Sequence, residues 1–261
     1  MMNRPENELQ IYRQKRAAAQ GAAKKQEVLK MDEEVPPIVS PAFISGPIDE
    51  GHMERNRIVA HRTRCAEADV CRQLRTKVLQ IMNAHGYKTL AITSPYHRNG
   101  KTTTALNLGI SIAFDLKQTV LLVDLDLRKP DLHRYLGVKP RVGLTDHLLR
   151  GAPLNDCFVR TPFKRISVLP VKTALNRSSE LLSSPKMTLL AQELKTRYAD
   201  RLVIYDMPPV LTQDDPIAFL PQVDAVLVVV RDGSTRADDM KRCLNALEKA
   251  NVIGIVLNNC W

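Results

Sequence analysis

Short apolar runs recur along the larger, C-terminal part of the chain, and segments with a helical spacing of apolar positions separate them. The runs are rich in β-branched side chains, which is typical of strands that are covered on both faces. We expect strands at residues 89–92, 120–123, 166–169, 202–205, 225–230 and 252–257. Alternation of such strands with helices predicts an α/β fold: a mostly parallel central sheet with helices on both faces.

Helix signals stand between and before these runs. Residues 66–83 predict a helix, and its apolar face is expected to carry Val70, Leu74, Val78 and Met82. Ser184 precedes Pro185, and Thr235 stands three residues before Asp238, so we expect these two sites to begin later helices.

The first 61 residues lack both kinds of periodicity. An Ala-, Gln- and Lys-rich stretch is followed there by the turn-forming pairs Ser40-Pro41 and Gly46-Pro47. We therefore predict a flexible, mostly disordered arm over residues 1–61 and one domain over residues 62–261.

Charge and composition narrow the function classes. The net charge is +10, and basic residues cluster at 13–16 and 55–64 without the interleaved aromatic side chains that bind single strands. A solvated tail and a solvated helix face explain these clusters as well as binding does. Among binding partners we rank a membrane-proximal protein above nucleic acid, and no nucleic acid is expected. The apolar run at 225–230 is far shorter than the ~20 residues of a membrane span, so no transmembrane segment is expected.

The turn after the first expected strand carries phosphate-binding chemistry. It reads T-S-P-Y-H-R-N-G-K-T-T-T from Thr93 to Thr104, and an apolar helix follows it. A strand, a turn with Gly-Lys-Thr and a helix are typical of a P-loop, whose amides and helix dipole face an anion. Lys101 is expected to reach the terminal phosphates, and the hydroxyl of Thr102 to hold Mg²⁺. We assign Asn99, Gly100, Lys101, Thr102 and Thr103 to binding of the ATP phosphates.

The same loop departs from the pattern G-x-x-x-x-G-K-[ST]. Pro95 stands where the first glycine belongs, and Gly100 is the one glycine that remains. Asn99 is expected to tolerate the left-handed backbone region better than most residues. A chance Gly-Lys-Thr, or a loop that no longer binds, is the alternative.

Carboxylates follow two further strands. Asp124 and Asp126 leave the strand at 120–123, and Asp206 ends the strand at 202–205. The carboxyl ends of parallel strands meet at one edge of the sheet, which is where ligands bind in such folds. Because Mg²⁺ with a nucleotide needs oxygen ligands there, we assign Thr102, Asp124 and Asp206 to the metal.

The order of these motifs resembles that of the bacterial tyrosine kinases of capsule and exopolysaccharide synthesis, which are P-loop relatives of the Min/Par ATPases. The resemblance rests on Gly100-Lys101-Thr102, then V-L-L-V-D-L-D-L-R-K-P, then L-V-I-Y-D-M-P-P-V-L. A lysine specific to the Min/Par loop would fall at position 96, which is Tyr96, so the kinase branch is favoured. The resemblance implies that Lys101, Asp124 and Asp126 are catalytic, and that Asp126 or Asp124 assists the incoming tyrosine hydroxyl.

The resemblance extends to the helix before the first strand, where these kinases carry an E-x-x-R-x-x-R oligomerisation motif. Asp69, Arg72 and Arg75 occupy that spacing here. They lie near one helical edge, so we expect a homo-oligomer in which they pair with a neighbouring subunit.

Kinases of this family usually finish in a tyrosine-rich tail, whereas residues 258–261 contain no tyrosine. The acceptor is then expected on another protein or at Tyr12, or the protein is an ATPase whose nucleotide state controls assembly. Three readings follow. The first is a cytoplasmic ATP- and Mg²⁺-dependent tyrosine kinase, held at the inner face of the membrane by a chain-length or polysaccharide co-polymerase protein. The others are a Min/Par-like switch ATPase and a scaffold that binds nucleotide weakly.

Overall fold

The computed structural model of the 261-residue chain describes residues 49–114 and 118–259. Most of the predicted arm, residues 1–48 with Tyr12, lies outside the described residues. In chain order the elements are α2 (Glu50–Arg55), α3 (Ala66–His85), β1 (Thr89–Thr93), α4 (Lys101–Ala113), β2 (Thr119–Asp124), α5 (Leu132–Tyr135), α6 (Leu144–Arg150), α7 (Leu154–Cys157), β3 (Val159–Arg160), β4 (Ile166–Leu169), α8 (Ser178–Leu182), α9 (Pro185–Thr196), β5 (Arg201–Asp206), α10 (Asp215–Phe219), the 3-10 helix η1 (Leu220–Gln222), β6 (Ala225–Arg231), α11 (Ala237–Ala246) and β7 (Val252–Asn258).

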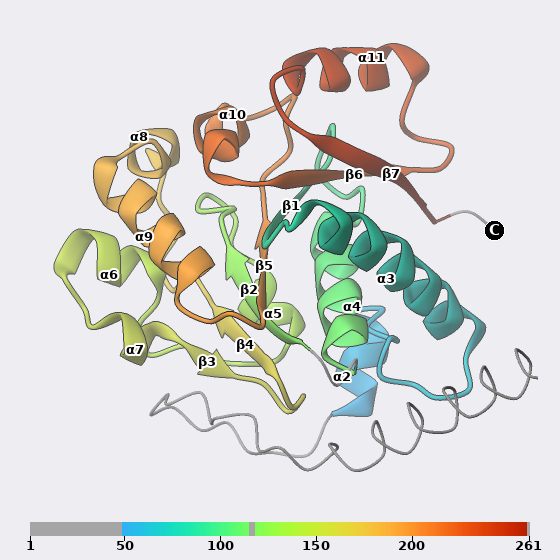
Figure 1. The fold of residues 1–261 in the computed structure, drawn as a ribbon, viewed down its shortest axis with the longest axis horizontal. Helices are drawn as coiled ribbons and strands as arrows, with labels where there is room; N and C mark the ends of the chain where they lie inside the picture. Colours follow the sequence, from blue (N-terminus) through green and yellow to red (C-terminus); the bar gives the residue numbers. More distant parts are fainter. Residues whose placement is uncertain (1–48, 115–117, 260–261) are drawn as a thin grey trace, which may run out of the picture. The chain divides into compact units, whose positions relative to one another are not determined.

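One sheet runs through the domain in the strand order β3-β4-β2-β5-β1-β6-β7 (Figure 1). Neighbouring strands are parallel, apart from the antiparallel pair β3–β4 at one edge. The mostly parallel α/β fold predicted from the sequence is therefore confirmed, with all six expected strands. β3 was not expected, because a two-residue strand leaves no alternation to detect.

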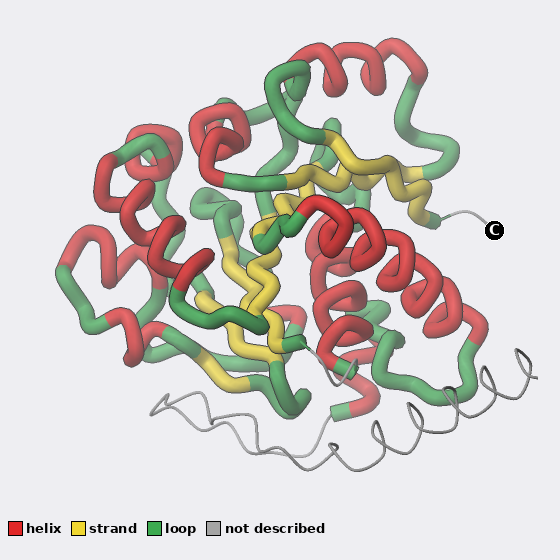
Figure 2. The backbone as a smooth tube through the Cα atoms, viewed as in Figure 1, coloured by secondary structure: helices red, strands yellow, loops and turns green. Residues whose placement is uncertain are grey.

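Helices cover both faces of the sheet (Figure 2). One apolar cluster joins a face of the sheet to α2, α3, α4 and α5. The other cluster joins the opposite face to α6, α7, α8, α9, α10 and α11. The central strands are buried along their whole length, which explains why they read as continuous apolar runs. None of the helices between residues 49 and 259 has both the length and the hydropathy that a membrane span requires.

Strand register brings the functional motifs to one edge of the sheet. Asp124 at the end of β2 pairs with Asp206 at the end of β5, and Asp206 in turn lies beside Ile92 of β1. The loop from β1 to α4 leaves from the same edge, so Lys101 begins its helix next to both carboxylates. The register of the parallel strands therefore places Lys101 and the two carboxylates at one edge of the sheet.

The segment at residues 49–61, called the strap below, belongs to the domain and not to the predicted arm. Met53 is 2% exposed, Ile58 is 0% exposed and Ala60 is 4% exposed, and all three join the apolar cluster on the α4 face. Met53 stands alone among polar residues and Ile58 to Ala60 is a run of only three, so no helix or strand periodicity predicts their burial. The sequence predicted a domain over residues 62–261, and the described residues 49–61 pack against that domain.

Asn107 of α4 holds the strap by hydrogen bonds through both ends of its amide. Its Oδ1 accepts from the backbone N–H groups of Val59 at 2.8 Å and Ala60 at 3.0 Å. Its Nδ2 donates to the carbonyl oxygens of Arg57 at 2.9 Å and Thr103 at 3.0 Å. One buried side chain therefore ties the strap to the helix that follows the P-loop.

The strap also contacts α5 and the end of β7. His52 Nε2 donates to the carbonyl oxygens of Arg134 and Tyr135, each at 3.0 Å. Arg57 Nη1 donates to Asn259 Oδ1 at 3.1 Å. Elements from the beginning, middle and end of the described chain are thus held together by one short segment.

Two details of the predicted helices need correction. Val70 is 63% exposed, although Val78 and Met82 are buried as predicted, and α3 also turns Ala68 and Leu79 inward. α11 has Arg236 at its N-cap, so Thr235 does not cap it. The Thr235 hydroxyl accepts from the backbone N–H of Arg231 at 3.2 Å. The other expected start is confirmed, since Ser184 Oγ accepts from Met187 N at the beginning of α9.

We expect Asn107→Ala to lower the free energy of unfolding by about 1–3 kcal/mol, because it leaves the buried N–H groups of the strap without an acceptor. Urea denaturation followed by circular dichroism measures the change. Asn83→Ala on the exposed side of α3 is the matched control and should change the value by less than about 0.5 kcal/mol. Equal effects of the two substitutions would show that the strap adds nothing to stability.

Candidate functional site

The loop between β1 and α4 enters the left-handed backbone region twice, although it contains one glycine. Arg98 and Gly100 both adopt the left-handed region, with φ of 64° and 92°. Asn99, which was expected to tolerate that conformation, does not adopt it and is 4% exposed. A Cβ atom on residue 100 would lie 2.0 Å from Asn258 Nδ2, so side-chain clash as well as backbone strain restricts that position to glycine.

The side chain of Lys101 lies among carboxylates at the edge of the sheet. Its Nζ is 3.0 Å from Asp126 Oδ2 and 3.8 Å from Asp206 Oδ1. The hydroxyl of Thr102 donates to Asp206 Oδ2 at 2.7 Å. The structure therefore brings together the lysine, the hydroxyl and two of the acidic residues that the sequence singled out.

Asp124, the third of these acidic residues, is bound by backbone amides. Its Oδ1 accepts from Asp126 N at 3.2 Å, and its Oδ2 accepts from Asp131 N and Leu132 N, each at 3.1 Å. The side chain is 0% exposed. Asp124 thereby fixes the path of the loop that carries Asp126.

Burial and mutual repulsion shift the pKa values of this group. Burial raises the pKa of Asp206 to about 6, although Lys101 and the Thr102 hydroxyl act in the opposite direction. Burial, with the neighbouring charge of Asp206, raises the pKa of Asp124 well above its usual value. Burial alone would lower the pKa of Lys101, but the charges of Asp206 and Asp126 outweigh it and raise that pKa, so Lys101 stays cationic.

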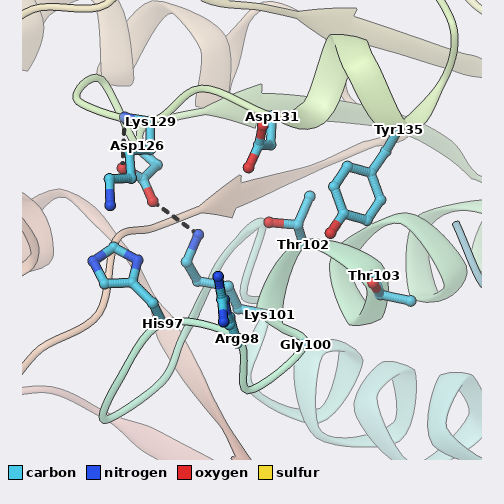
Figure 3. Close-up of a pocket in the computed structure, with 10 residues that line it drawn as sticks. All are labelled: His97, Arg98, Gly100, Lys101, Thr102, Thr103, Asp126, Lys129, Asp131 and Tyr135. Carbon is cyan, nitrogen blue, oxygen red and sulfur yellow. Dashed lines mark hydrogen bonds and ion pairs between the residues drawn. The ribbon is translucent and has the colours of Figure 1, made fainter.

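A cavity of about 270 Å³ opens over these groups (Figure 3). Its lining includes five residues that were assigned to binding or catalysis from the sequence, namely Gly100, Lys101, Thr102, Thr103 and Asp126. Five further lining residues were not assigned from the sequence. The missed residues beyond the loop are Lys129, Asp131 and Tyr135, and His97 and Arg98 belong to the loop itself. The missed residues all follow the Asp124–Asp126 motif within 11 positions, which is the one signal that could have found them.

The residues present fit a nucleotide with Mg²⁺. α4 directs its first amides and its positive dipole end at the cavity, beside a cationic lysine. Asp206 Oδ1 is buried and accepts no hydrogen bond from the described residues, which is an oxygen that a cation would satisfy. Within the described residues no group of three or more His, Cys, Asp or Glu side chains is arranged to hold a metal by itself. Mg²⁺ bound with phosphates needs few protein ligands, because phosphate and water oxygens supply the rest.

The three residues expected at an oligomer contact lie on α3, away from the cavity lining. Arg72 Nε donates to Asp69 Oδ1 at 3.2 Å within the helix. Arg75 Nη1 donates to the carbonyl oxygen of Ser111 at 3.0 Å. Each of the three therefore has a partner inside its own chain.

Comparison with known proteins gives consistent matches. Residues 87–252 match the AAA domain family. Tyrosine-protein kinase YwqD of Bacillus subtilis is 31% identical, over 79% of this chain and 86% of YwqD. Putative tyrosine-protein kinase EpsB of Ralstonia solanacearum is 30% identical over 73% of this chain, which spans 25% of EpsB.

Solved structures extend the comparison. The chimerical protein CapA2B2 is 27% identical with a TM-score of 0.73, over 79% of this chain and 90% of that one. The kinase domain of Escherichia coli tyrosine kinase ETK is 29% identical with a TM-score of 0.67, over 73% and 74%. The septum site-determining protein MinD of Pyrococcus horikoshii, complexed with Mg-ADP, is 25% identical with a TM-score of 0.56, over 65% and 69%.

The raised pKa of Asp206 predicts a stability change that depends on pH. Its native pKa of about 6 exceeds the ordinary 3.8, so the native state binds more protons than the unfolded state between these values. The free energy of unfolding therefore falls as pH rises through this window. We expect Asp206→Asn, without metal or nucleotide, to be more stable than the wild type at pH 7.5 by about 1–3 kcal/mol.

Urea denaturation at pH 7.5 and pH 4.5 measures this difference. At pH 4.5 most of the stability difference between Asp206→Asn and the wild type should disappear. Asp206 of the native wild type is then largely protonated and therefore uncharged, as Asn is. Asp232→Asn in an exposed turn is the control and should show no such pH dependence. An Asp206→Asn protein that is less stable than the wild type at pH 7.5 would contradict the expectation.

Proposed function

This chain belongs to the bacterial tyrosine kinase family of P-loop proteins, and from that membership we propose that it transfers the γ-phosphate of ATP to a tyrosine of another protein. The observation that carries the proposal is the convergence of Lys101, Thr102, Asp126 and Asp206 beside the first turn of α4. Phosphoryl transfer depends mainly on positioning and on neutralisation of charge, and these groups provide both.

The P-loop would hold the β- and γ-phosphates. The amides of Asn99, Gly100, Lys101, Thr102 and Thr103 lie at the start of α4, where the helix dipole favours an anion. Lys101 would exchange its ion pair with Asp126 for the phosphate oxygens. This exchange would also release the Asp126 carboxylate next to the reacting phosphate.

Thr102 and Asp206 would hold Mg²⁺, directly or through water, with Asp124 behind them. Bound Mg²⁺ would supply positive charge to the phosphoryl group during transfer. The hydrogen bond between Thr102 and Asp206 already sets the two oxygens side by side.

Asp126 is the better candidate for the group that accepts the tyrosine proton. Asp126 lines the cavity. Asp124 does not, and both of its carboxylate oxygens accept hydrogen bonds from backbone amides. A general base must reach the proton that it removes, so geometry favours Asp126 over the alternative that the sequence left open.

The acceptor tyrosine would come from elsewhere. Tyr205 is 0% exposed, so it is unsuited as an acceptor in the folded protein, and Tyr12 lies outside the described residues. One relative, ExoP of Rhizobium meliloti, is named a succinoglycan biosynthesis transport protein. We propose that the partner is an inner-membrane chain-length protein of exopolysaccharide or capsule export, with this domain at the cytoplasmic face.

Self-association through α3 is a second part of the proposal. Asp69 keeps a side chain that is 64% exposed, and Val70 beside it is 63% exposed. A neighbouring subunit would have to replace the contacts that Arg72 and Arg75 make within the chain.

Purified protein incubated with γ-labelled ATP and Mg²⁺, alone and with an export partner, tests the activity. We expect phosphotyrosine, and Lys101→Met should reduce its rate of formation at least about a hundredfold, because the cation at the transferring phosphate is lost. Lys249→Met on the exposed surface is the control. Free phosphate without phosphotyrosine would instead favour a Min/Par-like switch ATPase. Neither product, with no ATP binding, would favour a scaffold.

Asp126→Asn and Asp124→Asn separate the two candidate bases. We expect Asp126→Asn to slow phosphotransfer by about 10²–10⁴-fold while the dissociation constant of ATP changes little. Asp124→Asn should act mainly by loosening the loop, and so weaken ATP binding and lower thermal stability. A larger loss of phosphotransfer in Asp124→Asn, with ATP binding intact, would reverse the assignment.

A further inference from the structure

Side-chain hydrogen bonds attach the P-loop to the rest of the domain. Tyr96 Oη donates to Asp239 Oδ1 of α11 at 3.0 Å. Tyr96 Oη also accepts from Arg242 Nη2, which lies one turn further along α11, at 2.7 Å. Figure 1 shows α11 packed beside β6 and β7, on the side of the sheet opposite α3.

Tyr96, Asp239 and Arg242 form a closed set, called the latch below. Arg242 Nη2 also donates to Asp239 Oδ1 at 2.6 Å, so each member contacts the other two. The side chain of Asp239 is only 16% exposed, whereas that of Arg242 is 62% exposed. The latch therefore lies at the rim of the domain, where its removal leaves the apolar clusters intact.

A second attachment holds the loop on the other side of the cavity residues. Asn99 Nδ2 donates to Thr235 Oγ1 at 3.2 Å, and Asn258 Nδ2 donates to the carbonyl oxygen of Asn99 at 2.9 Å. His97 and Arg98, which line the cavity, stand between the two attachments. The loop is thus fixed on both sides of the two residues that face the ligand.

We propose that the latch positions the phosphate-binding loop. Tyr96, Asp239 and Arg242 hold the amides of residues 97–100 in their binding arrangement before a nucleotide arrives. Ordering a loop costs conformational entropy, and a loop ordered in advance binds its ligand more tightly. The proposal rests on the nucleotide-binding part of the proposed function and not on the identity of the phosphate acceptor.

Tyr96→Phe tests the latch, since it removes the hydroxyl and keeps the ring. We expect the dissociation constant of a fluorescent, non-hydrolysable ATP analogue to rise about two- to tenfold, which corresponds to one or two hydrogen bonds. Amide hydrogen exchange at residues 97–100 should become faster in the nucleotide-free protein. The thermal midpoint should stay within about 2 °C, because a surface change far from the core costs little.

Variants of Arg242 provide the matched series. Arg242→Gln should reproduce the effect of Tyr96→Phe, and Arg242→Lys, which keeps the cation, should restore part of the affinity. The double variant Tyr96→Phe with Arg242→Gln should bind no more weakly than the worse single variant, because both act on one contact. Lys241→Gln, an exposed neighbour on α11, should behave as the wild type.

Wild-type affinity together with unchanged exchange in Tyr96→Phe would overturn the proposal. Additive losses in the double variant would also overturn it. The exchange measurement needs no ligand, so it tests the latch even in a protein that binds no ATP. Absence of ATP binding by the wild type would remove the proposed function, whereas unchanged exchange would remove the latch.

Discussion

A lysine buried among aspartates is the constraint on which the rest of this structure depends. Asp124, Asp126 and Asp206 are almost completely buried, and Lys101 is the cation that contacts two of them. Their combined charge exceeds that of one lysine, and burying unbalanced charge is costly. Backbone amides at Asp124 and raised pKa values absorb part of the imbalance. Such a group is suited to receive a ligand that brings both a cation and an anion, as a metal nucleotide does.

The surrounding fold keeps this group rigid from several directions. The strap contacts α4 through Asn107 and α5 through His52. α11 contacts the P-loop through Tyr96, and β7 contacts it through Asn258. These contacts compensate for a loop that has one glycine and that places Arg98 in the left-handed region. Segments that are distant in sequence thus restrain the backbone at the charged edge of the sheet and in the glycine-poor loop.

The sequence predicts the fold well wherever an element is long and buried. The runs at 120–123 and 202–205 are strands because both of their faces are covered, and their parallel pairing then places Asp124 beside Asp206. The strap and the cavity residues Asp131 and Tyr135 could not be predicted in the same way. Their positions depend on single tertiary contacts, such as those of His52 with α5, and such contacts leave no periodic trace in sequence. Thr235 was misassigned for a related reason. Its local sequence pattern predicted a helix cap, but Thr235 Oγ1 accepts hydrogen bonds from Arg231 N and Asn99 Nδ2 instead.

The close approach of Asn258 to Gly100 has a consequence for the order of events during synthesis. Asn258 fills the space beside Gly100 and holds the carbonyl oxygen of Asn99, although 159 positions separate the two asparagines. β1, β2 and β5 leave the ribosome well before β7, so the carboxylates can assemble while the P-loop still lacks this support. A nascent chain that ends before Asn258 lacks the side chain that holds the carbonyl oxygen of Asn99. The support that Asn258 gives to the P-loop is therefore in place only when the last strand pairs with β6.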